Sequence, residues 1–96
     1  METRKIIRAN GAGVFFGEVI EENGNTIVAK DVRRIWEWVG ANTLSELAQQ
    51  GTTKPKECKI TCKVDKIKIF NVVEILDVTE EAAKTIDEVK EWKLAN

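Results

Sequence analysis

The sequence predicts an α+β fold, a small antiparallel β-rich domain of about five to six strands with two short helices. Runs of β-branched and aromatic residues alternate with turn residues along the chain, as in antiparallel sheets. Asn23-Gly24 separates two such runs and is typical of a tight hairpin turn. Thr43 and Thr79 precede segments that begin like helices. With 96 residues and no linker-like stretch, we expect a single domain over residues 1–96.

The N-terminal part is expected to form three consecutive strands. Residues 5–10 read as the first strand and residues 14–21 as the second. The glycines between them permit a tight strand-to-strand turn or a bulge. After the Asn-Gly turn, residues 26–30 return as the third strand.

A fourth strand and a helix are expected next. Residues 31–39 alternate so that both faces are partly apolar, and Val32, Arg34, Trp36 and Trp38 share one face. The Thr-Leu-Ser-Glu run at 43–46 has the spacing of a capping box. A helix of about two turns should follow and end at Gly51.

The C-terminal half combines strands with a second helix. Residues 58–64 alternate strictly between apolar and polar, with one buried face and one basic, wet face. Asp65-Lys66 is expected to turn the chain into residues 67–77, a central strand covered on both sides. Thr79 is a good N-cap for a short helix, and Trp92 should help to close the chain onto the body.

The composition excludes several classes of active site. The chain has no histidine and no tyrosine, so the commonest general base, zinc ligand and phenolic acid are missing. Fifteen basic and sixteen acidic residues give a net charge of -1, which provides no overall attraction to nucleic acid or membrane. We therefore expect a protein that binds without catalysis, and no cofactor or metal.

The two cysteines are expected to be reduced core residues. Cys58 and Cys62 are four residues apart on a predicted strand, about 13 Å, which is beyond the roughly 7 Å limit for a disulfide. Their spacing also differs from that of zinc ribbons. The N-terminus has no apolar signal segment and no run is long enough to span a bilayer, so a cytoplasmic location is expected.

The glycine run at 11–17 does not match a dinucleotide fingerprint. Its third glycine comes one place too late, and a strand follows where a helix should begin. The run is either a tight turn between strands or a place where the backbone approaches a ligand closely. The first alternative is the commoner one.

The most informative stretch for function is residues 33–38, where adjacent arginines precede two tryptophans. Guanidinium groups pair with anions and indole rings stack on flat groups, so phosphate and base would both find partners. The alternative is that the tryptophans are core and the arginines pair with nearby acids. On the first interpretation, the candidate ligand-binding residues are Arg8, Asn10, Phe16, Arg33, Arg34, Trp36 and Trp38.

Five motifs and a late tryptophan resemble a family of small tailed-phage and prophage proteins that is usually carried as a domain of unknown function. The resemblance covers nearly the whole chain. Ile60 stands where the family pattern prefers phenylalanine, which removes the support for stacking there. The matching motifs are GVFFG at 13–17, DVRRIWEWVGA at 31–41, LSELA at 44–48, CKI at 58–60 and TEEA at 79–82, followed by Trp92.

The chain is also similar to the phage Thoeris anti-defence sponges, oligomeric β-rich proteins that sequester cyclic nucleotide signals without cleaving them. That resemblance implies a homo-oligomer, a cyclic nucleotide or cyclic ADP-ribose type ligand, and phosphate contacts from Arg8 and from Arg33 or Arg34. Two other binding functions stay open, and an enzyme with an Asp/Glu or Arg/Lys mechanism is the fourth and least favoured alternative. One is an adaptor that binds a host or phage protein through an aromatic or edge-strand surface. The other is a single-stranded nucleic-acid module, which the neutral net charge disfavours.

Overall fold

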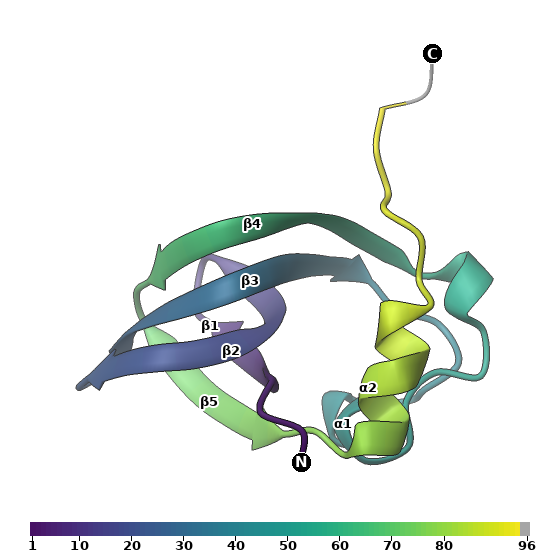
Figure 1. Ribbon diagram of the computed structural model, residues 1–96, viewed down its shortest axis with the longest axis horizontal. Coiled ribbons are helices and arrows are strands. Elements are labelled where there is room, and N and C mark those ends of the chain that lie inside the picture. Colours follow the sequence, from purple (N-terminus) through teal and green to yellow (C-terminus); the bar gives the residue numbers. More distant parts are fainter. Residues whose placement is uncertain (95–96) are drawn as a thin grey trace.

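The protein folds around a five-stranded antiparallel sheet flanked by two short helices (Figure 1). The computed structural model describes residues 1–94. The strands lie in the order β4-β3-β2-β1-β5, and every neighbouring pair is antiparallel. The predicted α+β fold class is therefore confirmed. The elements are β1 (Lys5–Ala9), β2 (Gly13–Asn23), β3 (Thr26–Glu37), α1 (Leu44–Gln50), a 3-10 turn η1 (Pro55–Glu57), β4 (Lys59–Ile69), β5 (Val72–Asp77) and α2 (Glu80–Asp87).

The sheet curls strongly on itself. Only Phe70 and Asn71 connect β4 to β5, although these strands lie at opposite edges of the sheet. Asn71 has a φ of 58°, in the left-handed region that Asn tolerates in tight turns. The Asn10 N–H donates to the Asn71 carbonyl at 2.9 Å, and the Val72 N–H donates to the Asn25 carbonyl at 2.8 Å. One end of β4 therefore meets the start of β5 (Figure 1).

Alternation along the strands builds two hydrophobic clusters, one on each face of the sheet. On β1, Ile6 packs with the helices and Ile7 packs inside the curl. On β2, Phe16 packs with the helices and Phe15 packs inside the curl, and both are buried. Each buried side chain of this size contributes about 1.5–3 kcal/mol. The inner cluster consists of Ile7, Ala9, Phe15, Ile27, Ala29, Val32 and Ile69.

Both helices begin where the sequence predicts. The Glu46 N–H donates to Thr43 Oγ1 at 3.1 Å, as in a capping box. Glu46 Oε1 accepts from the Asn42 N–H at 2.8 Å, so the side chain reaches back one residue beyond the N-cap Thr43. The Ala82 N–H donates to Thr79 Oγ1 at 3.0 Å. Within residues 1–94, no helix has the length and apolar character needed to cross a membrane.

The glycine run forms a turn and a point of close packing. Gly11 and Gly13 have φ values of 85° and 109° and connect β1 to β2, which confirms the strand-to-strand turn. Gly17 lies opposite a bulge in β3, and a Cβ there would come within 2.9 Å of Val32 Cγ2. All three glycines therefore have structural reasons to be glycine.

The prediction of a turn at Asp65-Lys66 is wrong. β4 continues through both residues to Ile69, and the chain turns at residues 70–71 instead. β3 is twelve residues long and pairs with β4 as far as Ile27↔Ile69, so Lys66 pairs with Lys30 and Asp65 lies within the paired part of the strand. Residues 67–77 are consequently not one central strand. They are the end of one edge strand and the whole of the other.

The prediction that both cysteines are core residues is half wrong. Both thiols are free, and Cys58 is buried, but Cys62 is exposed. Between the pairs Arg33↔Lys63 and Ile35↔Ile60, β4 has two residues where β3 has one. This bulge breaks the period-2 alternation on which the prediction depended.

Candidate functional site

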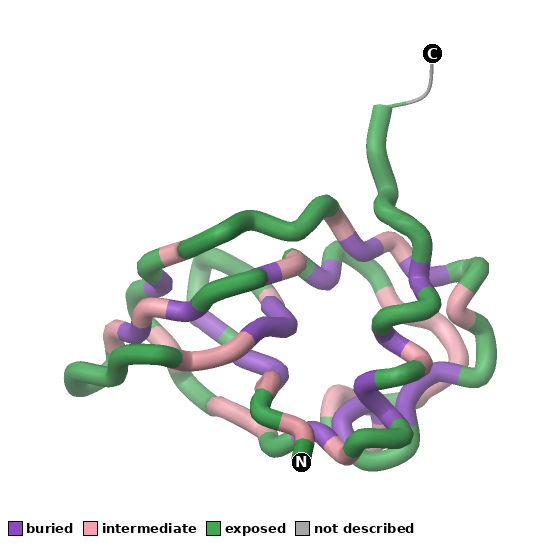
Figure 2. The backbone as a smooth tube through the Cα atoms, viewed as in Figure 1, coloured by how far each residue is buried: buried purple, intermediate pink, exposed green. Residues whose placement is uncertain are grey.

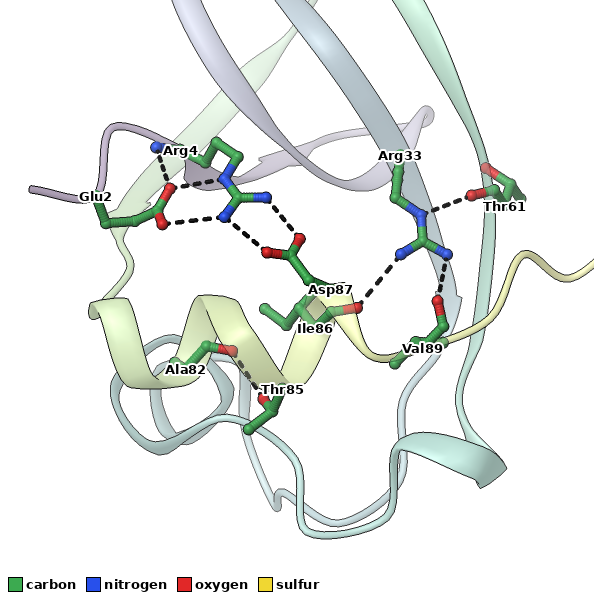
Figure 3. Close-up of polar contacts among 9 residues, drawn as sticks. All are labelled: Glu2, Arg4, Arg33, Thr61, Ala82, Thr85, Ile86, Asp87 and Val89. Atoms are coloured by element: carbon green, nitrogen blue, oxygen red, sulfur yellow. Dashed lines mark hydrogen bonds and ion pairs between the residues drawn. The ribbon is translucent and has the colours of Figure 1, made fainter.

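The two adjacent arginines of β3 lie on opposite faces of the sheet. Arg33 points toward α2, where its guanidinium donates to the Val89 carbonyl at 2.9 Å and to the Ile86 carbonyl at 3.3 Å (Figure 3). It also donates to the carbonyls of Thr61 and Ile60 on β4, at 2.9 and 3.2 Å. Burial lowers the pKa of Arg33 from its ordinary value. Arg33 is therefore a structural side chain that joins the end of α2 to the sheet.

Arg34 faces the other way, toward the mouth of the curled sheet. Its guanidinium carbon lies 4.8 Å from the centre of the Phe15 ring, which places a cation over an aromatic face. The main-chain N–H of Arg34 donates to Thr61 Oγ1 at 3.1 Å. Among the described residues, no carboxylate oxygen lies within 4.0 Å of its guanidinium. Arg34 is exposed, so its guanidinium N–H groups are accessible to an anion from solution.

Two hollows meet at Arg34, and we call them together the glycine-turn groove. The first, of about 320 Å³, lies between the turn at Asn10–Ala12 and the corner that holds Lys68 and Phe70. The second, of about 250 Å³, lies between Gly13 and the tryptophans of residues 36 and 38. Ala12 and Arg34 border both hollows. Together they offer a volume typical of a small-molecule site.

Aromatic rings stand at the two ends of the groove. Phe70 is 57% exposed, and the Lys68 ammonium lies 5.5 Å from its ring centre. At the other end, Trp36 is 65% exposed and stacks on Trp92, with ring centres 5.9 Å apart. A flat ligand group would meet an aromatic surface at either end, and an anionic group would meet Arg34 between them.

The other predicted site residues are scattered. Arg8 is exposed and pairs with Glu74 across β5 at 2.8 Å, outside the groove. Phe16 belongs to the hydrophobic cluster that joins Ile6 to the buried residues of both helices, which we call the helix-side cluster. It is buried there with Arg4 over its ring, so it has no open surface for a ligand. Asn10 does border the groove. The structure thus brings together Asn10, Arg34, Trp36 and Trp38 and separates them from Arg8, Phe16 and Arg33.

The prediction that Trp36 and Trp38 share one strand face is wrong. β3 ends at Glu37, so Trp38 lies beyond the regular alternation. Trp38 is half-buried and packs against the helix-side cluster, whereas Trp36 is exposed. Both still border the second hollow.

Phe15, Lys68 and Phe70 belong to the groove but were not predicted. The turn between β4 and β5 lies at residues 70–71. The sequence pattern predicts this turn at residues 65–66 instead and so assigns Lys68 and Phe70 to a covered central strand. Asn71 was the usable signal, because an asparagine after a run of alternating residues favours a turn with positive φ.

The fold and the groove define a small α+β scaffold that presents cationic and aromatic side chains at one end of a curled sheet. Residues 2–86 match the family described as Domain of unknown function (DUF6948), so the chain belongs to that family. No curated protein and no solved structure matched the chain.

Proposed function

We propose that this chain is a non-catalytic, phage-encoded binding protein that holds a small nucleotide in the glycine-turn groove. The ligand class is a cyclic nucleotide or cyclic ADP-ribose type signal, and the biological role is to sequester that signal from a host defence system. The phage origin and this role derive from the resemblance to tailed-phage proteins and anti-defence sponges. The binding site derives from the geometry of the groove.

The observation that carries the proposal is the position of Arg34. Its guanidinium lies between two hollows and has no carboxylate partner within 4.0 Å among the described residues. A phosphate placed there would form charge-assisted hydrogen bonds, and Lys68 would add a second positive charge. Bases on either side would reach Phe70 in one hollow and Trp36 in the other.

A larger hollow nearby is a poorer candidate. It has a volume of about 520 Å³ and shares Lys68 and Phe70 with the groove, but Glu21 and Glu22 also border it. Two carboxylates beside a phosphate would repel it. Charge therefore favours the glycine-turn groove, although each of its two hollows is smaller than this one.

Calorimetry with a panel of cyclic di- and trinucleotides and cyclic ADP-ribose isomers tests the proposal. A ligand that binds the native protein should bind Arg34→Gln about 10- to 100-fold more weakly, since hydrogen bonds to a charged group contribute about 1.5–3 kcal/mol. Arg8→Gln is the matched control, because it removes an exposed arginine outside the groove. Absence of binding across the panel, or equal losses in the two variants, would refute the proposal.

The non-catalytic part needs a separate measurement. The ligand should be recovered intact by mass spectrometry after prolonged incubation with the protein and denaturation of the complex. Recovery of a hydrolysed or rearranged product would show instead that the groove is an active site.

A further inference from the structure

The outer edge of β4 is open over most of its length. In the ladder, β4 pairs with β3 from Lys59 to Ile69, and it is the last strand of the sheet on that side. Five consecutive residues in its middle, 62–66, are all exposed (Figure 2). Backbone N–H and C=O groups along such an edge are free to pair with another extended chain.

The start of β4 already accepts an additional extended segment. Glu91 forms an isolated parallel bridge with Ile60, and the Trp92 N–H donates to the Ile60 carbonyl at 2.9 Å. Beyond this point, residues 93–94 leave the sheet and project from the body (Figure 1). The chain's own C-terminal segment therefore shows how a further strand adds to this edge, but it covers only the first residues.

The net positive charge of β4 favours an acidic strand as its binding partner. Lys59, Lys63, Lys66 and Lys68 lie on β4, against a single acid, Asp65. None of these four lysines has a carboxylate oxygen within 4.0 Å among residues 1–94. Two β4 edges side by side would bring eight lysines together with only two acids, and this excess of like charge is destabilising. A second copy is therefore disfavoured at this edge, and an acidic strand is favoured.

An apolar anchor lies at the same end of β4. Trp92 stacks on Trp36, and the Lys59 ammonium lies 5.5 Å from the Trp92 ring centre. A hollow of about 460 Å³ beside them is bordered by Thr61, Trp92, Lys93 and Leu94, and Leu94 is 90% exposed. Exposed aromatic and aliphatic groups beside a charged rim are typical of the central part of a protein interface.

We propose that the β4 edge binds an extended acidic segment of a partner protein. The segment adds to the sheet as a further strand along residues 61–66, its carboxylates pair with Lys63 and Lys66, and an apolar side chain enters the hollow beside Trp92. Backbone hydrogen bonds supply affinity, and the lysines and the hollow supply selectivity. A homo-oligomer of this chain would have to use another surface.

The proposal can be tested with a synthetic peptide that alternates glutamate and valine and ends in leucine. The exposed thiol of Cys62 is a built-in reporter, because Cys58 is buried and should not react. The acidic peptide should bind, slow the alkylation of Cys62 several-fold and protect the backbone amides of residues 62–66 from hydrogen exchange. A peptide with a central proline and the same charge should not bind, because proline cannot donate to a strand ladder.

Charge reversal gives the sharper test. The double variant K63E/K66E should bind the acidic peptide about tenfold more weakly, and should now bind the same peptide with lysine in place of glutamate. Thermal unfolding checks that the double variant folds, and K63Q/K66Q replaces it if it does not, with the same loss of the acidic peptide expected. The proposal is overturned if the acidic peptide does not bind, if the proline peptide binds equally well, or if Cys62 becomes protected by raising the protein concentration alone. Binding in the glycine-turn groove should be unchanged in both variants, so failure here leaves the proposed function intact.

Discussion

Replacement of Arg33 by alanine should destabilise the fold strongly, although the residue is one of two adjacent arginines on a strand. Arg33 donates four hydrogen bonds to main-chain carbonyls on β4 and around the end of α2, two of them at 2.9 Å and two at 3.2 and 3.3 Å. A hydrogen bond with a charged partner contributes about 1.5–3 kcal/mol when its geometry is good. If the two short bonds supply most of the effect, Arg33→Ala should lose about 3 kcal/mol, which corresponds to a fall in Tm of about 12–24 °C for a domain of this size.

Two further variants test the reasoning. Arg33→Lys keeps the charge but cannot present a planar fork to several carbonyls, so it should lose about half as much. Arg34→Ala removes only an exposed cation from the Phe15 ring, which is worth about 0.5–1 kcal/mol. Urea unfolding of the three variants measures the differences. If Arg33→Ala and Arg34→Ala unfold at the same urea concentration, the assignment of opposite roles to the two arginines is refuted.

Three other predictions concern single residues. Gly51→Ala should lower the free energy of unfolding by roughly 1–3 kcal/mol in urea, because the added Cβ would overlap Thr85 Oγ1, whereas Gly11→Ala, at a similar φ but in open space, should cost less. The side-chain hydrogen bond from Arg4 holds the pKa of Glu2 below its ordinary value of 4.5. The contact should therefore stabilise the fold fully above pH 4.5, and this stabilisation should be lost as the pH falls through the lowered pKa. The Tm of Glu2→Gln should depend less on pH in that range than the Tm of the native protein. An unchanged dependence of Tm on pH would contradict a stabilising contact between Glu2 and Arg4. The folded protein should react with one equivalent of iodoacetamide, at Cys62, and mass spectrometry that found Cys58 modified first would contradict its burial.

Local patterns in the sequence predicted most of the elements. Thr43 and Thr79 mark the two helix starts. In each case the threonine Oγ1 accepts from the main-chain N–H three residues later, so the cap depends only on residues close together in the chain. The glycines at 11 and 13 mark the first turn because positive φ values depend on the residue itself. The prediction of a turn at residues 65–66 failed because the length of β4 is set by its pairing with β3, which is distant in the sequence.

The candidate site was predicted only in part. Asn10, Arg34, Trp36 and Trp38 do meet at one groove, but the other predicted residues, Arg8, Phe16 and Arg33, lie elsewhere. Alternation shows that neighbouring residues face opposite ways, but it does not show which face the helices will cover. The curl of the sheet also brings Phe70 close to the glycine turn from sixty residues further along the chain, and no local pattern encodes that approach.

By itself, the sequence determined the antiparallel α+β class, the positions of the helix caps and the first turns, and the absence of histidine and tyrosine from any site. These properties follow from composition and from interactions between residues close together in the chain. The tertiary structure decided which arginine holds the fold and which faces the groove, which cysteine is exposed, and which strands form the edges of the sheet. Those properties depend on strand order, on bulges and on the curl of the sheet, which arise from contacts between distant segments.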